Sequence, residues 1–373
     1  MPLPSRFLSL LLAFVLLQIL CRPSPGASPE QVTKASQSSS PATPESTAYL
    51  PLVQRGDLPT APIYMANYAY PQDFAELAKR GINTILTDLS SDGSDWSATY
   101  QAAIAHKLKL IPLIWGDNQT IWAWNDRAKE WELNAKKYPS SVGAQFLKFL
   151  KENPKFLAQT FAIYSFHEPL WEPDKTGCDR LKKFYQQITE QEFPDGSLLV
   201  YGEDITMGWP DSGACLSGVV DYESHHIYPF AQIGDFRYRA FNHQNNYYDP
   251  PTNDLESVIQ AELAYIDARL ARYAASPPAA TGRRPKPILL IQTFAAIVEE
   301  PGLWNRMPEA WEMETLASRI VLERKDKIVG LAWYPFQNPS SNYTHWLARD
   351  RYDTTGADRW EVITKVGGLL LGK

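Results

Sequence analysis

The chain of 373 residues is 44% hydrophobic and 21% charged, an ordinary globular composition with ample length for a large buried core. Its formal net charge of −6 is spread along the sequence without a polybasic segment, which argues against nucleic acid and anionic lipid surfaces as partners. The 12 tryptophans and 19 tyrosines are many for this length, so the meaning of this aromatic excess depends on where the residues fall.

Residues 1–27 are predicted to be a secretory signal rather than part of the fold. MPLPSR is a short basic region, and the apolar stretch FLSLLLAFVLLQIL has 14 residues, too few to span a bilayer comfortably as a helix. Cys21 follows directly, as in bacterial lipoproteins, although QIL before it lacks that motif's small residues. We expect a secreted or cell-surface protein with no transmembrane helix after processing; a lipid anchor at Cys21 is the alternative.

The rest of the chain divides into a tether and one domain. Residues 28–60 are rich in Ser, Pro and Thr and cannot bury enough apolar surface to offset the entropy of ordering, which predicts a disordered tether. Residues 61–373 are predicted to be a single domain. Cys178 and Cys215 lie in it, and in an oxidising compartment they either form a disulfide or remain two buried thiols.

From residue 61 a short apolar run followed by an amphipathic stretch recurs eight times. Helical spacing is clear in residues 72–81, which end in a C-cap-style glycine, Gly81, and in residues 252–273. The alternation predicts a (β/α)8 TIM barrel; an open doubly wound sheet is the alternative, but it needs a glycine-rich turn where this chain has ANYAYPQD. The apolar runs are 62–68, 82–89, 108–116, 161–169, 198–204, 219–229, 287–295 and 327–336.

Active sites of such barrels lie at the carboxyl ends of the strands, and there this sequence carries aromatic, amide and carboxyl side chains. Flat aromatic faces suit the C–H faces of sugar rings, and the polar groups suit their hydroxyls, so we expect an oligosaccharide or polysaccharide ligand and no cofactor. The candidate residues, in chain order, are Asn67, Asp88, Trp115, His167, Glu168, Trp171, Glu203, Asp204, His226, Tyr228, Gln292 and Trp333.

Three short motifs resemble the clan A glycoside hydrolases, the barrel group of retaining cellulases, mannanases and β-galactosidases. They are Glu168-Pro169, His226-Ile227-Tyr228 and Trp333. The resemblance spans residues 61–373. It implies that Glu168 is the general acid/base and that Trp333 lies under the sugar.

The chain departs from this family at two positions. His167 replaces the Asn before the acid/base, and Gln292 stands where the strand-seven Glu nucleophile is expected. A neutral amide cannot form the glycosyl ester of retaining hydrolysis. Three interpretations stay open: hydrolysis in which another carboxylate (Asp88, Glu203 or Asp204) partners Glu168; substrate-assisted hydrolysis of an acetamido sugar oriented by Gln292; and a barrel that binds sugar without cleaving it.

A metal-dependent hydrolase is a further alternative of a different class, with His167, His225, His226, Asp88 and Glu168 as ligands. Adjacent residues on a strand point to opposite faces, so only one of the two neighbouring histidines can face the barrel mouth. A serine nucleophile has no G-x-S-x-G motif to support it. The sequence carries no signal for an oligomer.

Overall fold

The computed structural model describes most of the chain beyond residue 61, and all of this part belongs to one compact unit, Val53–Lys373. The expected signal and tether, and both Cys178 and Cys215, lie outside the described residues. The described ranges are 62–90, 92–114, 122–125, 127, 130–134, 136–164, 191–193, 198–204, 220–242, 247–275, 284–296, 304–337, 343–348 and 357–373.

A parallel sheet of seven strands forms the centre of this unit, in the order β3-β2-β1-β14-β12-β7-β6. Every pair of neighbours in it is parallel, which requires a crossover between strands and agrees with the predicted alternation of strand and helix. The strands are β1 (Ile63–Asn67), β2 (Thr84–Leu89), β3 (Lys109–Ile114), β6 (Tyr201–Asp204), β7 (Tyr222–Ile227), β12 (Lys286–Gln292) and β14 (Gly330–Tyr334).

Residues 160–164 join the two edge strands of this sheet. Their parallel bridges run to β3 on one side, at Leu110 and Leu113, and to Val200 beside β6 on the other. The backbone N–H of Phe161 donates to the carbonyl of Leu110 at 2.7 Å. This segment takes the position of the missing strand, so the sheet closes into the (β/α) barrel that the sequence predicted. The remainder of the predicted strand 161–169 lies outside the described residues.

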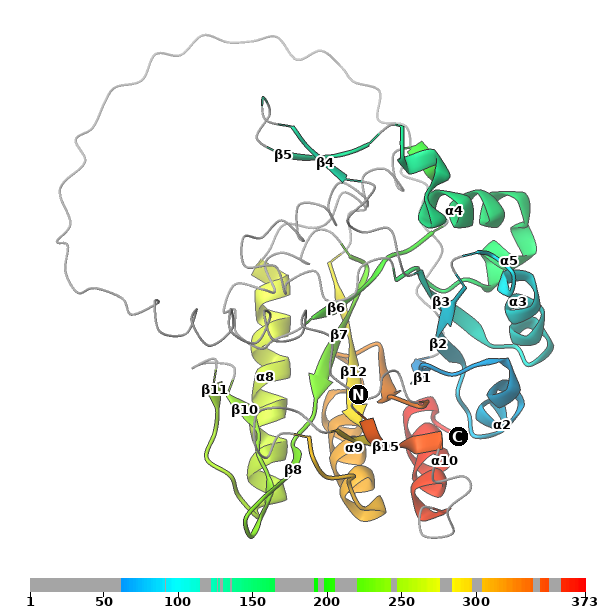
Figure 1. The fold of residues 1–373 in the computed structure, drawn as a ribbon. Coiled ribbons are helices and arrows are strands. Elements are labelled where there is room, and N and C mark those ends of the chain that lie inside the picture. The colour runs from blue at the N-terminus through cyan, green and yellow to red at the C-terminus, as the bar shows by residue number, and fades with distance from the viewer. Residues whose placement is uncertain are drawn as a thin grey trace, which may run out of the picture. The chain divides into compact units, whose positions relative to one another are not determined.

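The helices lie outside the ring of strands (Figure 1). Local signals match their ends: Gly81, just after α2, has a φ of 89°, as predicted from its C-cap position, and the Ser141 side chain accepts from the Ala144 N–H at 3.1 Å to cap α4. The α-helices are α2 (Phe74–Lys79), α3 (Trp96–Ala105), α4 (Val142–Glu152), α5 (Pro154–Gln159), α8 (Leu255–Ala275), α9 (Ala310–Arg324) and α10 (Ala357–Leu371), with short 3₁₀ turns at Pro71–Asp73 and Tyr138–Ser140.

The buried core has two layers, one inside the ring and one between the ring and its helices. On β1, Ile63 and Met65 belong to the inner layer, whereas Tyr64 and Ala66 belong to the outer one. Both faces of each strand are therefore buried, which explains why the strands read as nearly continuous apolar runs. Each fully buried large side chain contributes about 1.5–3 kcal/mol to stability.

Two glycines allow close approach around β1. A Cβ on Gly330 of β14 would lie 2.3 Å from the carbonyl oxygen of Ile63, and one on Gly367 of α10 would lie 2.6 Å from the Tyr64 ring. The Tyr64 hydroxyl donates to the backbone carbonyl of Ile363 in α10. The first barrel strand is thus packed tightly between β14 and α10.

Short two-stranded antiparallel sheets follow the barrel strands, and the sequence did not predict them. β4 pairs with β5 after β3, β8 with β9 after β7, and β13, directly after β12, with β15, which follows β14. All three extend the carboxyl ends of barrel strands, where the site was expected. Their bounds are β4 (Trp122–Asn125), β5 (Glu130–Leu133), β8 (Phe230–Ile233), β9 (Phe236–Tyr238), β13 (Phe294–Ala296) and β15 (Tyr343–Trp346); β10 (Phe241–Asn242) pairs with β11 (Tyr247–Tyr248).

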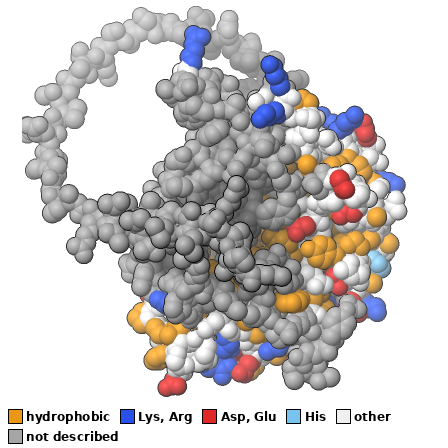
Figure 2. Space-filling view, in the orientation of Figure 1, with side chains coloured by type: hydrophobic (Ala, Val, Ile, Leu, Met, Phe, Trp, Pro, Cys, Tyr) orange, Lys and Arg blue, Asp and Glu red, His pale blue; other side chains and the backbone are white. Residues whose placement is uncertain are grey.

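Among the helices that the structure describes, none combines the length and apolar character needed to cross a bilayer. On the face drawn in Figure 2, acidic and basic side chains are interspersed, with hydrophobic side chains between them.

Candidate functional site at the barrel mouth

The structure describes eight of the twelve candidate residues at least in their backbone. Asn67 ends β1 and is buried; Asp88 is on β2 and half-buried; Glu203 and Asp204 end β6. His226 is on β7 and Tyr228 follows it, Gln292 ends β12, and Trp333 is on β14. Trp115, His167, Glu168 and Trp171 lie outside the described residues.

His226, Tyr228 and Tyr334 form a stack of rings at the ends of β7 and β14. The His226 and Tyr228 ring centroids are 4.8 Å apart with 15° between the planes. Tyr228 and Tyr334 are 5.6 Å apart at 21°. His226 and Tyr228 are half-buried, so this stack is reachable at its edge. The sequence analysis named His226 and Tyr228 as candidates for ligand binding; it did not name Tyr334, which the structure places beside them.

Three further aromatic rings surround the stack edge-on. Tyr68 meets Tyr334 at 5.7 Å, and Phe294 and Trp304 meet Tyr228 at 5.1 Å and 6.0 Å. Edge-to-face contacts of this kind are the favoured geometry for aromatic pairs. We refer to Tyr68, His226, Tyr228, Phe294, Trp304 and Tyr334 as the aromatic group.

Two members of the aromatic group have a left-handed backbone. Tyr68 has a φ of 59° and Trp304 a φ of 49°. For a residue with a Cβ this conformation costs roughly 1–2 kcal/mol. Such strain persists only where the surrounding structure fixes it, and it is concentrated at functional sites. One of the two strained residues contacts Tyr334 and the other contacts Tyr228.

Trp333 lies on the outer side of β14 rather than at the mouth. It is fully buried in the helix-facing layer, and its indole N–H donates to the Tyr64 hydroxyl at 2.7 Å. The next residue, Tyr334, belongs to the inner layer. Side chains alternate along a strand, so the aromatic residue that β14 presents to the mouth is Tyr334.

Polar side chains lie at the ends of β1 and β2, beside the aromatic group. Asn67 is buried, and no described residue donates a hydrogen bond to its Oδ1 atom. Burial, and after it the negative charges of Asp88 and Asp73, raises the pKa of the half-buried Tyr70 hydroxyl. The Asp73 carboxylate is itself fixed by the Gln337 side chain, which donates to it at 3.0 Å. This side of the mouth is therefore acidic.

Gln292 occupies the strand-seven position, and its amide is engaged by backbone groups. Its Oε1 accepts from the Phe230 N–H at 3.0 Å. Its Nε2 donates to the carbonyls of Phe230 at 3.1 Å, Phe294 at 3.0 Å and Arg306 at 3.3 Å. The side chain is fully buried. Gln292 thus ties the end of β12 to β8 and to the segment before α9.

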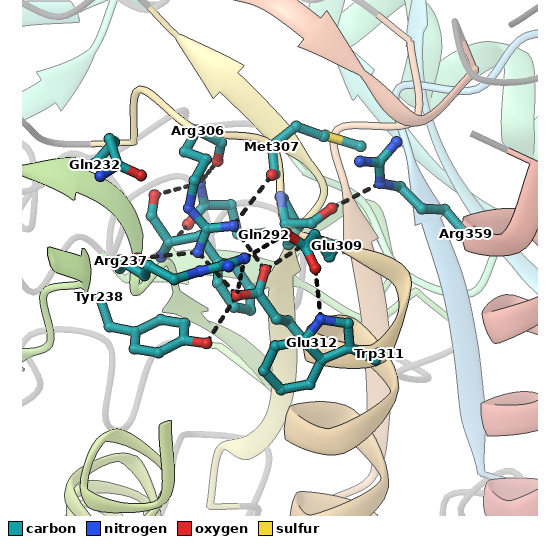
Figure 3. A network of polar contacts seen from close by, with 12 residues as sticks. Gln232, Arg237, Tyr238, Gln292, Arg306, Met307, Glu309, Trp311, Glu312 and Arg359 are labelled. Carbon is teal, nitrogen blue, oxygen red and sulfur yellow. Dashed lines mark hydrogen bonds and ion pairs between the residues drawn. The ribbon is translucent and has the colours of Figure 1, made fainter. Parts of the chain in front are cut away.

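A buried carboxylate, Glu312, holds the adjacent loops together (Figure 3). Arg306 donates to both of its oxygens, at 2.7 Å and 3.1 Å, and Arg237 and Tyr238 donate to Oε1 at 3.0 Å and 2.7 Å. The Glu309 N–H donates to Oε2 at 2.7 Å. Hydrogen bonding to Glu312 and burial together raise the pKa of the Tyr238 hydroxyl, burial being the larger cause. We call Arg237, Tyr238, Arg306, Glu309 and Glu312 the Glu312 network.

The two neighbouring histidines of β7 face different partners, as the strand alternation predicted. The His225 ring contacts Tyr265 and Tyr273 of α8, whereas His226 stacks on Tyr228. Next to His225, Glu223 and Arg269 of α8 form a buried ion pair. Within the described ranges no three His, Cys, Asp or Glu side chains are grouped closely enough to hold a metal ion. The two histidines cannot ligate one ion.

The comparisons with known proteins give distant structural similarity only. No protein-family model matches the chain, and no curated protein matches it either. Among solved structures, it is similar to a family 39 glycoside hydrolase from the gut symbiont Bacteroides cellulosilyticus WH2, at 15% identity and a TM-score of 0.48 over 83% of this chain and 64% of that one. The chain therefore spans less than two-thirds of that enzyme's length.

Two other similar structures are also glycoside hydrolases or relatives of them. One is a family 17 β-1,3-glucanosyltransferase from Rhizomucor miehei, at 15% identity and a TM-score of 0.46 over 74% of this chain and 88% of that one. The other is the endoglucanase Cel5A of Pseudomonas stutzeri, at 13% identity and 0.45 over 80% and 85%. Likeness this distant transfers no activity, and the barrel is established by its own strand order and pairing.

Proposed function

We propose that the mouth of this barrel binds carbohydrate and that the protein hydrolyses O-glycosidic bonds with Glu168 as general acid. The aromatic group is the observation that carries the proposal. A half-buried stack of rings, bordered by the Asn67 amide and the acidic end of β2, supplies apolar faces for a sugar ring and polar groups for its hydroxyls. Ligand sites are typically lined in this way, with a few polar groups among aromatic ones.

The carboxylate that partners Glu168 cannot come from position 292. An amide is not a nucleophile for glycosyl transfer, and the Gln292 amide already bonds four backbone groups. The partner is therefore expected on another strand. Asp88 on β2 and Glu203 or Asp204 on β6 are the candidates.

The separation between the Glu168 carboxyl and its partner decides the stereochemical outcome. Retaining enzymes separate their carboxyl groups by about 5–5.5 Å and inverting enzymes by about 6.5–9.5 Å. Residues 160–164, which begin the run that contains Glu168, neighbour β6 and are two positions from β2. Side chains on both strands can reach across a closed barrel, so the anomeric form of the product has to be measured for each candidate.

The test uses a panel of aryl glycosides, with the anomeric form of the first product followed by NMR. Glu168→Gln should lower the rate on poor leaving groups by about 10²–10⁴-fold, the usual contribution of general acid catalysis. Loss of activity in Asp88→Asn would assign Asp88 as the partner, and loss in Glu203→Gln or Asp204→Asn would assign β6. The anomeric form of the first product then shows whether that pair of carboxyl groups retains or inverts. An unchanged rate in Glu168→Gln would remove Glu168 from the mechanism.

Carbohydrate binding without hydrolysis is the second candidate function, and the engagement of Gln292 favours it. The Gln292 side chain hydrogen-bonds to backbone groups, so strand seven offers no nucleophile, as expected for a site that binds sugar without cleaving it. Wild type that binds polysaccharide but cleaves no glycoside of the panel would select this candidate. Failure to bind any glycan in a folded sample would overturn both candidates.

Export is part of the proposal and is supported by the sequence of residues 1–27. Expression of the full chain in a secreting host should release a protein that lacks this segment. Mass spectrometry of the mature amino terminus gives the cleavage site. A lipid-modified Cys21 at that terminus would select the anchored alternative, and an intact first segment on a cytoplasmic protein would contradict export.

A further inference from the structure

We propose a second carbohydrate-binding position on the outer rim of the barrel mouth, with the ring of Trp311 as its platform. The inference rests on the proposed function and extends it from one bound sugar to a longer glycan chain. Trp311 is the second residue of α9 and is 50% exposed. Among the described residues its ring has no aromatic or cationic partner, and the exposed half of the side chain is the surface that a ligand can contact.

The orientation of the Trp311 ring is fixed by hydrogen bonds. Its indole N–H donates to Oε2 of Glu309 at 2.6 Å, and Arg237 donates to the other oxygen, Oε1, at 2.5 Å. Arg237 also donates to the fully buried Glu312. A half-exposed aromatic side chain is therefore connected by two carboxylates and a guanidinium to the core (Figure 3).

The backbone that carries this ring is held from three further directions. The Arg359 side chain of α10 donates to the Pro308 carbonyl at 2.6 Å. Gln292 at the end of β12 donates to the Arg306 carbonyl, and Arg306 binds Glu312. A platform held in this way loses little conformational entropy when a ligand binds, which is the general benefit of preorganisation.

The same contacts place the platform beside the proposed site. Gln292 bonds both to the Arg306 carbonyl and to Phe230, two residues after Tyr228 of the aromatic group. The N-terminal end of α9 is thus at the carboxyl ends of β7 and β12. A glycan that enters the mouth can extend across this rim.

A sugar ring fits the exposed surface better than a protein partner does. One half-exposed tryptophan offers on the order of 100 Å², whereas a stable protein interface needs about 800 Å² on each side. The next exposed apolar residue of α9, Leu322, is 58% exposed. It lies eleven residues further along, about 16 Å of helix. The ring is instead bordered by the Glu309 carboxylate and the Arg237 guanidinium, which can bond sugar hydroxyls.

The test compares Trp311→Ala with Leu322→Ala, an exposed apolar residue of the same helix, by affinity electrophoresis in gels that contain soluble β-glucan, xylan or mannan. Trp311→Ala should weaken binding of the retarding polysaccharide about three- to tenfold, the size of one aromatic stacking contact. Leu322→Ala should migrate as wild type. Trp311→Phe keeps a ring without the donor to Glu309 and should recover part of the affinity. Binding of short aryl glycosides should not change in any of these variants.

Each result decides between the outer position and the mouth. Equal affinity in Trp311→Ala and wild type, while Tyr228→Leu binds less, would overturn the outer position and leave the proposed function standing. Equal losses in Trp311→Ala and Leu322→Ala, or no recovery in Trp311→Phe, would also overturn it. A folded wild type that none of the three polysaccharides retards would overturn the outer position and the proposed function together.

Discussion

The aromatic group and the Glu312 network both lie at the ends of β7 and β12, but they are held in different ways. The network is built from charge-assisted hydrogen bonds, and its central carboxylate receives five of them. The aromatic group is built from ring contacts, and two of its members have a strained backbone. In the first region both oxygens of the Glu312 carboxylate are hydrogen-bonded. In the second, strained backbone positions carry two of the rings.

We interpret the Glu312 network as a structural element that fixes loops and the aromatic group as part of the proposed binding site. A fully bonded, fully buried carboxylate has no capacity left for a ligand, so the Glu312 network fixes loops. Strained aromatic residues around a half-buried stack are unfavourable for stability alone, which agrees with the proposed binding role. Gln292 lies between the two regions, because its amide bonds to Phe294 of the aromatic group and to Arg306 of the Glu312 network. Substitutions in the two regions should therefore affect stability and binding in opposite proportions.

The largest loss of stability is expected for Glu312→Gln. The change removes the charge that Arg306 and Arg237 pair with inside the protein, which should lower the free energy of unfolding by about 3–5 kcal/mol. Glu314→Gln is the matched control on the same helix. Glu314 is exposed and pairs with Lys365, so its loss should cost about 0–1 kcal/mol. Urea unfolding measures both, and similar small losses would contradict the structural role of the network.

Gln292→Glu should destabilise the protein by about 2–4 kcal/mol at neutral pH, because a carboxylate would face the carbonyls of Phe230, Phe294 and Arg306. We also expect no gain of glycosidase activity from it. The introduced carboxyl should have a raised pKa in the folded state. The loss of stability is therefore complete above that raised pKa, and it becomes smaller as the pH falls towards about 4.3, the ordinary pKa of Glu.

The control for this change is Gln145→Glu. Gln145 is exposed and donates to one carbonyl, that of Ser140, so the change should alter stability by less than about 0.5 kcal/mol. Unfolding curves at several pH values and assays on aryl glycosides give both readouts. Hydrolysis by Gln292→Glu that wild type lacks would show that the clamp can release its side chain for catalysis.

Tyr228→Leu tests the other region. Loss of the Tyr228 ring, which stacks on both His226 and Tyr334, should cost about 1–2 kcal/mol of stability but lower glycan affinity at least about tenfold. Phe149→Leu is the control, because Phe149 also stacks, on Phe156 at 5.3 Å, in the helix-facing layer far from the mouth. It should lose similar stability without losing affinity. Calorimetric titration with the polysaccharide that binds wild type measures the affinity of both variants. Equal affinities of Tyr228→Leu and Phe149→Leu would remove the aromatic group from the site.

The smallest effect concerns the exposed ion pair that orients Trp311. The hydrogen bond from Arg237, and after it that from Trp311, lowers the pKa of the Glu309 carboxyl. Its stabilising contribution, under about 1 kcal/mol for an exposed pair, is therefore present above the ordinary Glu pKa near 4.3 and is lost as the pH falls through the lower folded pKa. The difference in fluorescence between wild type and Trp311→Phe should follow this transition. Glu309→Gln should abolish it.

The sequence predicted the barrel well because its strands are buried on both faces and read as apolar runs. Because both faces of each strand are apolar, the sequence does not show which residues face the inside of the barrel. In the run that contains Trp333 and Tyr334 both residues are aromatic, and without an apolar–polar alternation nothing marks which of them is on the inner face. The choice depends on the register with β1 and β12, and register is a property of the folded sheet.

Sequence patterns could not predict the hydrogen-bonding role of Gln292 either. Its position predicted a residue opposite Glu168, but its partners are backbone groups of Phe230, Phe294 and Arg306. Those groups come from β8, from β13 and from the segment before α9. The antiparallel pairs there are short and follow barrel strands directly, so their residues look like loop in the sequence. His226 and Tyr228 were chosen from the sequence because His-x-Tyr resembles a motif of the glycoside hydrolase barrels, and their binding role stays a prediction.

The contact between Tyr64 and α10 joins two segments that lie far apart in the sequence. The Tyr64 hydroxyl donates to a carbonyl 299 residues later and accepts from the Trp333 indole 269 residues later. Burying this hydroxyl without an acceptor would cost about 1–3 kcal/mol, and its carbonyl acceptor is in place only once α10 has docked. Contacts this distant in sequence slow folding. We therefore expect the docking of α10 against β1 to be a late step in folding.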